Sequence, residues 1–320
     1  MPTLAEHINW HLKLPQHGWI VRGVRDTPPL TARDDGVILL SMVGTASVLP
    51  YLVAVKTFAL ALGRGRVVIV DDGTLTPRDR DLLAWHLADP RIIAIDAVDT
   101  GPCPRGGTWE RLLTILDLRR DAYVIQLDSD TLTLGAVPEV AAAIDAGRCF
   151  TLRGEESAQL LAADDFVARL ASENSRHVQR AIEQAIDRTG IARYVRGCSG
   201  FAGFAPSSEG RAVAESFSRA AEGIVGAARW REWGTEQVTS NVVVANSADP
   251  MLLPYDRYRN FWNDGVPAGV WGDAFRRHLP LRRAHLSGRD ARRDQAAGRG
   301  LTNDSSAAIE VRANTSSHPA

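Results

Sequence analysis

The chain has 320 residues, of which 45% are hydrophobic, and its formal net charge at pH 7 is −1. This length and apolar content suffice for a sizeable core in one large domain. A nearly neutral charge gives no general electrostatic reason to bind nucleic acid or an anionic membrane surface. Cys103, Cys149 and Cys198 form no CxxC pair, so neither a disulfide framework nor a cysteine-based zinc site is indicated. We therefore expect a cytoplasmic protein that binds no nucleic acid.

The two ends of the chain differ in composition from its middle. Residues 1–35 show no long apolar run behind a basic start, and no segment reaches the roughly 18 apolar residues expected of a membrane span. Residues 289–320 are rich in small, charged and polar side chains. We predict an N-terminal extension over 1–35, one α/β domain over 36–288, a flexible tail over 289–320, and no transmembrane segment.

Strand-like and helix-like segments alternate within the predicted domain. A Ser and a Gly flank the first helical segment, and Thr76 and Pro77 are typical of a helix N-cap and first turn. Uniformly apolar strands separated by helices indicate a mostly parallel sheet covered on both faces. The predicted strands are 36–44, 66–73, 91–98 and 122–127, and the predicted helices are 47–63, 77–89 and 109–120.

Carboxylates follow two of these strands. Asp128 and Asp130 end the segment "AYVIQLDSD", and Asp71 and Asp72 end "RVVIVDD". Two like charges so close together are unfavourable to bury unless a cation, a basic side chain or several hydrogen-bond donors compensate them. A lone "DDG" is more often a turn or a helix cap than a site. Because ligands of parallel sheets bind outside the carboxyl ends of the strands, the sequence predicts a site at this edge.

One family with two aspartates after a strand does not match. Haloacid-dehalogenase-like phosphatases use DxDxT, but Leu132 occupies the threonine position here, between Thr131 and Thr133. Their nucleophile is also expected after the first strand, whereas Asp128 follows the fourth. The spacing therefore disfavours a phosphatase.

The segment "YVIQLDSDTLTLG" resembles the DxD strand of GT-A nucleotide-sugar glycosyltransferases, particularly the glycogenin-like group, glycosyltransferase family eight. The resemblance implies a Rossmann-like α/β fold and a divalent metal, Mn²⁺ or Mg²⁺, bound by Asp128 and Asp130 and by the donor diphosphate. Asp130 would be the more direct ligand, and Asp128 and Ser129 would also contact the donor. Hard carboxylate oxygens suit these cations.

Upstream segments extend the resemblance. "LLSMVG" is similar to the family's first strand, which implies that Met42, Val43 and Gly44 lie beside the nucleoside. "VIVDDG" resembles the next strand, and Asp72 would then contact uracil or ribose. In "WERLLTILDL", Arg111 matches the arginine that reaches the donor, a role that suits a guanidinium fork. The alternative for Arg111 is a charge on a helix surface.

Downstream, "WGTEQVTSN" resembles the family's acceptor-side helix. The resemblance places Gln237 near the reacting face of the sugar and makes Glu236 a candidate base. The alternative is an exposed polar helix start capped by Thr235. "RAHLSG" resembles the HxxG signature, whose histidine, here His285, would be the third protein ligand of the metal. The alternative for His285 is a packed core histidine.

Two positions depart from the family pattern. The lysine after HxxG falls at Ala291, although Arg289, Arg292 and Arg293 lie nearby, and the central NxG motif has no asparagine in "GCSGFAGFAP". We predict a metal-dependent hexosyltransferase with a UDP-linked donor, with retention favoured and the sugar and acceptor unspecified. A nucleotidyltransferase of related fold, which would carry a basic Gly-rich loop after its first strand, and a non-catalytic nucleotide-sugar binding protein are the alternatives.

Overall fold

The computed structural model describes residues 21–170, 177–260 and 275–277, and within them a seven-stranded sheet forms the centre of the molecule. Its strand order is β10-β6-β9-β4-β1-β2-β3. The β1–β2, β1–β4, β2–β3 and β10–β6 pairs are parallel, and only β9 runs antiparallel to its neighbours β4 and β6. The predicted mostly parallel α/β sheet is therefore confirmed. The strands are β1 Val37–Val43, β2 Arg66–Asp71, β3 Arg91–Ala94, β4 Tyr123–Leu127, β6 Phe150–Arg153, β9 Gly197–Phe204 and β10 Met251–Leu252.

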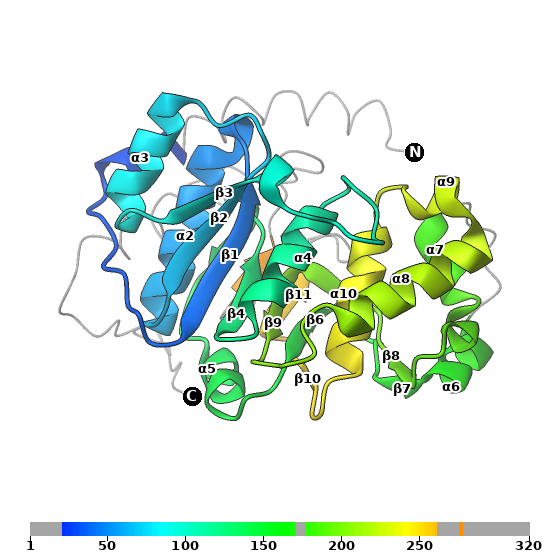
Figure 1. The fold of residues 1–320 in the computed structure, drawn as a ribbon. Coiled ribbons are helices and arrows are strands. Elements are labelled where there is room, and N and C mark those ends of the chain that lie inside the picture. Colours follow the sequence, from blue (N-terminus) through cyan, green and yellow to red (C-terminus); the bar gives the residue numbers. More distant parts are fainter. Residues whose placement is uncertain (1–20, 171–176, 261–274, 278–320) are drawn as a thin grey trace, which may run out of the picture.

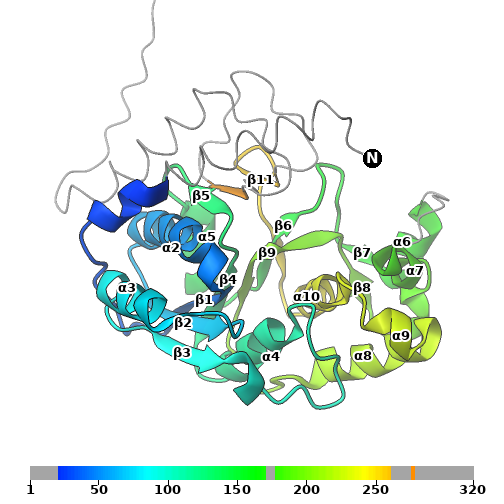
Figure 2. The ribbon, with the colours of Figure 1, turned by 90° about the horizontal axis from the view of Figure 1, so that it is seen from above.

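Helices cover both faces of this sheet. α2 and α4 both pack on β1 but from opposite sides, and α10 lies on the α4 side, against β9 (Figures 1 and 2). Strands β1, β2 and β4 bury nearly all of their side chains between these layers. The helices are α2 Val48–Leu62, α3 Pro77–Leu87, α4 Trp109–Leu118, α5 Pro138–Asp145, α6 Ala163–Arg169, α7 Val178–Glu183, α8 Ala212–Val225, α9 Ala227–Trp230 and α10 Thr235–Ala245.

Two small sheets and four 3-10 turns complete the described part. β5 (Thr131–Thr133) begins directly after Asp130 and pairs with β12 (Phe275–Arg277), which also pairs with β11 (Tyr258–Asn260). β7 (Leu161–Ala162) pairs with β8 (Arg193–Tyr194). The predicted aspartates thus lie in the tight connection between β4 and β5. The 3-10 turns are η1 Arg22–Asp26, η2 Thr45–Ser47, η3 Ile95–Ala97 and η4 Ile186–Thr189.

Most predicted helix ends are observed. The hydroxyl of Thr76 accepts a hydrogen bond from the backbone N–H of Asp79 at 3.2 Å, and Pro77 is the first residue of α3. Gly63 ends α2 with φ of 69°, a conformation that glycine adopts without steric penalty. Ser47 is the N-cap residue of α2, as predicted, but its side chain makes no capping bond to the helix, because its hydroxyl donates to the carbonyl of Gly44 at 3.0 Å.

Several predicted elements are too long, among them β3 and α4. β3 ends at Ala94, because residues 95–97 turn into η3, whose closing bond runs from the N–H of Val98 to the carbonyl of Ile95. α4 ends at Leu118, because Arg119 and Arg120 form the hydrogen-bonded turn that leads into β4. β3 is the last strand in the sheet order, so only one of its edges is paired among the described residues. Its side chains are partly or fully exposed.

One helical stretch of the described residues is long and apolar enough to cross a membrane, by length and composition alone. It covers Thr45–Leu62, contrary to the expectation that no segment would qualify. In this structure its residues Tyr51, Leu52, Val55 and Phe58 are completely buried in the core. Core helices of globular proteins satisfy the same length and composition test, so the stretch is weak evidence for a membrane span.

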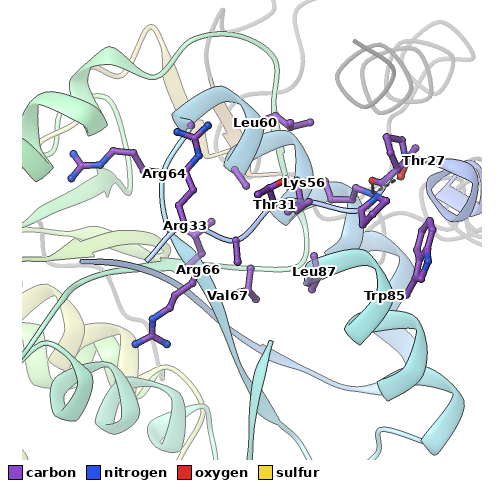
Figure 3. A pocket seen from close by; sticks show the side chains of 18 of the residues that line it. Thr27, Thr31, Arg33, Lys56, Leu60, Arg64, Arg66, Val67, Trp85 and Leu87 are labelled. Atoms are coloured by element: carbon purple, nitrogen blue, oxygen red, sulfur yellow. Dashed lines mark hydrogen bonds between the residues drawn. The ribbon is translucent and has the colours of Figure 1, made fainter. Parts of the chain in front are cut away.

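A buried lysine fastens the segment after η1 to the domain. Nζ of Lys56, on α2, donates to Oγ1 of Thr27 and to the carbonyl of Pro28, both at 2.6 Å, and lies 3.0 Å from Nδ1 of His86 on α3 (Figure 3). Burial lowers the pKa of Lys56 to about 8. Burial, followed by the charge of Lys56, lowers the pKa of His86 to about 4. His86 is therefore neutral at pH 7, and its Nδ1 accepts a hydrogen bond from the ammonium group of Lys56.

We predict a pH-dependent stability from this cluster. The pKa of His86 is lower in the folded chain than in the unfolded chain, so the unfolded state binds more protons as the pH falls from about 6.5 to about 4. The free energy of unfolding should consequently decrease by up to about 3 kcal/mol over this interval and level off below it. Urea unfolding of wild type and His86→Gln at pH 7 and pH 4 measures the difference. His177→Gln, at an exposed position, should retain the wild-type pH dependence.

Candidate functional site

The carboxyl ends of β1 and β2 meet at Gly44 and Asp72. The N–H of Asp72 donates to the carbonyl of Val43 at 3.1 Å, and a Cβ placed on Gly44 would lie only 2.0 Å from Oδ2 of Asp72. A side chain at position 44 would therefore require the carboxylate of Asp72 to move. Oδ1 of Asp72 accepts from the backbone and hydroxyl of Thr74, at 2.9 and 2.6 Å. Met42, Val43, Gly44 and exposed Asp72 thus lie together at the sheet edge, as predicted from the sequence.

The two aspartates of "VDDG" have different surroundings. Buried Asp71 accepts from the N–H groups of Gly73 and Leu75, at 2.9 and 3.3 Å, and forms an ion pair with Arg80. These contacts make Asp71 part of the turn into α3, the structural alternative for this motif. Asp72 is the carboxylate that faces solvent beside the end of β1.

Asp128 and Asp130 lie in the connection from β4 to β5, and their backbone is well fixed. The N–H of Asp128 donates to the carbonyl of Gly200 on β9 at 2.9 Å, and the carbonyl of Asp128 accepts from the hydroxyl of Thr131, also at 2.9 Å. Asp130 is 9% exposed, and Ser129 between them is half-buried. Two largely buried acidic side chains therefore follow the carboxyl end of β4, a central strand of the sheet.

Arg111 connects this turn to α10. Its Nη1 forms an ion pair with Oδ1 of Asp128, and its Nη2 lies 3.3 Å from both carboxylate oxygens of Glu236. The side chain is only 8% exposed, so the alternative of a surface helix charge is wrong. Arg111 belongs to α4, which is buried along almost its whole length and therefore holds the guanidinium in place. The positive group that the paired aspartates require is, in part, Arg111.

Glu236 is fully enclosed by polar contacts. Oε2 accepts from the hydroxyls of Thr108 and Ser199, at 3.0 and 3.3 Å, in addition to its contacts with Arg111. Burial raises the pKa of the Glu236 carboxyl, and Asp128 raises it further, whereas Arg111 acts in the opposite direction. The side chain is therefore a buried acceptor whose charge depends on Arg111.

The helix that carries Glu236 does not begin as an exposed, Thr-capped helix. Its N-cap is Gly234, which makes no side-chain cap, and Thr235 is buried and accepts from Nε1 of Trp109 at 3.0 Å. Thr235 thus joins α10 to α4 instead of capping α10. This contact sets the side-by-side placement of Glu236 and Arg111 on neighbouring helices.

Thr108 and Ser199 belong to the cluster but were not predicted as site residues. Thr108 has φ of 72°, which is uncommon for a residue other than glycine, and it follows two glycines with positive φ. A Gly-Gly-Thr sequence before a helix was the available signal. Ser199 stands in the segment that replaces the family's NxG motif.

The charges of the cluster suit a divalent cation. Asp128 and Glu236 share the guanidinium of Arg111, and the nearly buried Asp130 follows Asp128 by two residues. Carboxylate oxygens are ligands that Mg²⁺ and Mn²⁺ favour. Among the described residues no group of three acidic, His or Cys side chains is arranged to hold a metal alone. Asp128 and Asp130 therefore fit a cation that completes its ligands from a bound diphosphate or from other residues. His285, Arg289 and Ala291 lie outside the described residues.

Gln237 and Asn241 face a hollow next to the cluster. The hollow has a volume of about 250 Å³ and lies between α10, α7 and β8. Nδ2 of Asn241 donates to the carbonyl of Gly197 at 3.3 Å, which fixes the amide beside β9. Gln237 follows Glu236 on α10, and Asn241 lies one helical turn after Gln237 on the same helix, so both amides line the hollow from α10.

A larger cavity lies at the other end of the strands. It has a volume of about 860 Å³ and is bordered by the amino end of β2, by α2 and by Trp85 (Figure 3). Two of its arginines are already paired, Arg64 with Asp35 and Asp145, and Arg66 with Asp34. It is bordered by the Lys56 cluster, and the described residues that line it include no pair of carboxylates comparable with Asp128 and Asp130. The predicted reaction site is therefore not this cavity.

Comparisons with known proteins point to a fold, not to a close relative. No protein-family model matches the sequence, and no curated protein matches it. The structure is similar to that of the galactosyltransferase LgtC, solved with donor and acceptor sugar analogues, at a TM-score of 0.50 and 12% identity, over 83% of this chain and 97% of LgtC.

Two other solved structures show weaker similarity. The apo form of WbbM, a bifunctional glycosyltransferase, matches with a TM-score of 0.47 and 12% identity over 72% of this chain and 41% of WbbM, so the chain spans less than half of that protein. Core-mannan synthase A from Aspergillus fumigatus, in an Mn/GDP form, matches with a TM-score of 0.42 and 10% identity over 69% of this chain and 73% of that protein. The likeness to LgtC shows that the fold is of the GT-A type.

Proposed function

We propose that the protein is a metal-dependent glycosyltransferase that moves a hexose from a nucleotide donor, a UDP-sugar, to an acceptor. The observation that carries this proposal is the cluster at the β4 carboxyl end, where Arg111 bridges Asp128 and Glu236 next to Asp130. A guanidinium held between carboxylates is fixed in position before any ligand arrives. The GT-A fold supports the same assignment by analogy.

The donor would lie along the carboxyl ends of β2, β1 and β4. We propose that Met42, Val43, Gly44 and Asp72, which lie at the carboxyl ends of β1 and β2, contact the nucleoside. Asp128 and Asp130, with His285 as a proposed third ligand, would hold Mn²⁺ or Mg²⁺, which neutralises charge on the departing diphosphate.

The transferred sugar would lie beside Arg111 and α10. Ser129 and Arg111 would contact the donor, with Gln237 near the reacting face of the sugar. We propose transfer with retention of the anomeric configuration, as the glycogenin-like features favour. In support of this proposal, Arg111 of α4 pairs with Asp128, after β4, and with Glu236, the residue before Gln237 on α10.

Glu236 fits a positioning role better than that of a general base. Its oxygens accept from Thr108, Ser199 and Arg111, so they are already engaged. A general base must instead reach the proton that it abstracts. We propose that Glu236 orients Arg111, and that a retaining transfer proceeds without a base from this side chain.

The first strand's loop distinguishes the nucleotidyltransferase alternative. That class usually cradles phosphates in a Gly-rich, basic loop after the first strand, and residues 44–47 contain no basic side chain. Thr45 also bonds Thr74 and Asp79, and the space above Gly44 is filled by Asp72. The loop after β1 is thus bonded to the loop after β2 and leaves no space for a phosphate above Gly44, which favours sugar transfer over nucleotidyl transfer.

We predict that UDP or a UDP-sugar stabilises the protein only with Mn²⁺ or Mg²⁺, because the diphosphate and the aspartates repel each other without a cation. A ligand at a hundred times its Kd adds about 2.7 kcal/mol to the free energy of unfolding. Thermal unfolding with UDP, GDP and ADP sugars, in Mn²⁺ or in EDTA, measures the effect. Stabilisation that is equal in EDTA would refute the cation bridge.

A further inference from the structure

Two neighbouring hollows, one of them lined by Gln237 and Asn241 of α10, share a pair of arginines. The hollow of about 250 Å³ beside Gln237 and a neighbouring one of about 380 Å³ are both lined by Arg180 and Arg196. The larger hollow also has an apolar wall, formed by Leu161, Phe166 and Leu170. Two guanidiniums therefore stand at the junction of two small concave sites.

A single carboxylate is shared by these arginines. Glu183 accepts from Nε of Arg196 at 3.0 Å and pairs with its terminal nitrogen, while Nη1 of Arg180 lies 3.9 Å away. The hydroxyl of Tyr194 also donates to Glu183, at 3.1 Å. Arg180 and Glu183 are almost fully buried. Such burial of charge is unfavourable unless opposite charge and hydrogen bonds compensate it.

Positive charge exceeds negative charge around the two hollows. The described side chains that line them include three arginines, Arg169, Arg180 and Arg196, and two carboxylates, Glu155 and Glu183. Arginine's planar fork matches the oxygens of a carboxylate or phosphate. The junction therefore favours a ligand that carries an oxyanion.

The sheet order shows on which side of the reaction site this junction lies. β2 and β1 carry the proposed nucleoside contacts, β4 carries the aspartates, and β9 follows β4 in the order. α10 packs on β9 and contacts β8 and α7, which lie beyond it in Figure 2. A ligand in the hollows would thus approach Gln237 from the side opposite the nucleoside.

The walls of the smaller hollow are held in place without a ligand. Nε2 of Gln179 donates to the carbonyl of Gly234 at 3.0 Å, and a Cβ on Gly234 would clash with Gln179 at 2.9 Å. The side chain of Asn246 on the C-cap of α10 accepts from the N–H of Arg193 at 3.0 Å and donates to its carbonyl at 2.9 Å. α7, β8 and α10 are therefore tied together, as a preorganised site requires.

We propose that these hollows form an acceptor subsite, in which Arg180 and Arg196 bind an oxyanion on the acceptor sugar. This rests on the proposed function and specifies its acceptor class, a saccharide with a carboxylate or a phosphate group. The hydroxyl to be glycosylated would point toward Gln237, with the anionic group held away from the donor diphosphate. Placing the anion there also separates it from Asp128 and Asp130.

Binding without turnover tests the subsite. Titration calorimetry would measure glucuronate, glucose 6-phosphate, glucose and inorganic phosphate against wild type, with and without UDP and Mn²⁺. We expect one of the two anionic sugars to bind at least tenfold more tightly than glucose and than inorganic phosphate. The preferred sugar then distinguishes carboxylate from phosphate recognition.

Arg196→Gln should weaken binding of that anionic sugar by about tenfold or more, as expected for loss of a charge-assisted hydrogen bond. Arg148→Gln is the matched control, because Arg148 also pairs with a carboxylate, Asp249, and its side chain is 33% exposed against 32% for Arg196. The control should bind like wild type. Arg196→Lys, which keeps the charge but loses the fork, should give an intermediate loss.

Several results would overturn the subsite. The subsite is contradicted if glucose binds as tightly as both anionic sugars, or if inorganic phosphate does. It is also contradicted if Arg196→Gln and Arg148→Gln lose affinity equally. No detectable binding of either anionic sugar in any condition would contradict it as well. Competition by UDP-glucuronate but not by free glucuronate would assign the anion to the donor sugar instead. Stabilisation by UDP with Mn²⁺ should persist in Arg196→Gln, and its absence in wild type would mark failure of the proposed function.

Discussion

Replacing Asp130 by asparagine should reduce sugar transfer by ~100-fold or more while leaving the protein folded. The change keeps the size and shape of a nearly buried side chain but removes an anionic ligand for the cation. A cation at the departing diphosphate contributes several kcal/mol of transition-state stabilisation, and each 1.4 kcal/mol corresponds to about tenfold in rate. Initial rates of nucleoside diphosphate release across a Mn²⁺ titration measure the loss.

Asp145→Asn provides the control for this substitution. Asp145 is 71% exposed and pairs with Arg64, which lies just before the amino end of β2, so its neutralisation should leave transfer unchanged. Circular dichroism and thermal unfolding should show both variants folded. Full transfer by Asp130→Asn at low Mn²⁺ would contradict the metal assignment and show that the "DSD" segment is a structural turn.

Arg111→Ala should have the largest effect on stability, with transfer also lost. The guanidinium is 8% exposed and contacts Asp128 and Glu236, whose side chains are 15% and 3% exposed. Its removal leaves two carboxylates without their shared cation, and breaking a buried pair in this way typically costs about 3–5 kcal/mol. Guanidinium chloride unfolding at pH 7 gives the difference in the free energy of unfolding. Arg229→Ala, which disturbs the exposed pair with Glu232, should cost less than about 1 kcal/mol.

A double substitution separates the structural and catalytic parts of this effect. Glu236→Gln removes one of the carboxylates that Arg111 compensates, so Arg111→Ala should destabilise the Glu236→Gln protein less than it destabilises wild type. Transfer should stay absent in the double variant, because the guanidinium that we propose as a donor contact is still missing. Additive losses of stability would contradict a shared ion-pair network, and restored transfer would contradict a donor contact by Arg111.

The sheet could be predicted because its signals are local. Apolar β-branched runs, the Thr76-Pro77 start and the Gly63 stop each act within a few residues, and they identified β1, β2 and β4 and the helices between them. The errors were at element ends. At these ends the hydrogen bonds of a single turn determine where an element stops. Examples are η3, which ends β3, and Ser47, whose hydroxyl bonds Gly44 instead of α2.

The candidate site was predictable only where one segment carries it. Asp128 and Asp130 follow directly from their strand, whereas the bridge from Arg111 to Glu236 joins residues far apart in the sequence, through α4 and α10. The roles of Thr108 and Ser199 depend on the same packing, which no periodicity encodes. The arginine junction at α7 and β8 depends on the folded positions of Arg180, Glu183 and Arg196. The position of His285 is still a prediction from the sequence.

The most direct test is product analysis after incubation of the protein with Mn²⁺ and a panel of UDP-, GDP- and ADP-sugars, with water or added saccharides as acceptor. Metal-dependent release of a nucleoside diphosphate and free or transferred sugar, absent in EDTA and in Asp130→Asn, is the predicted result. No release from any donor, or release that is equal in EDTA, would contradict metal-dependent sugar transfer at the β4 carboxyl end.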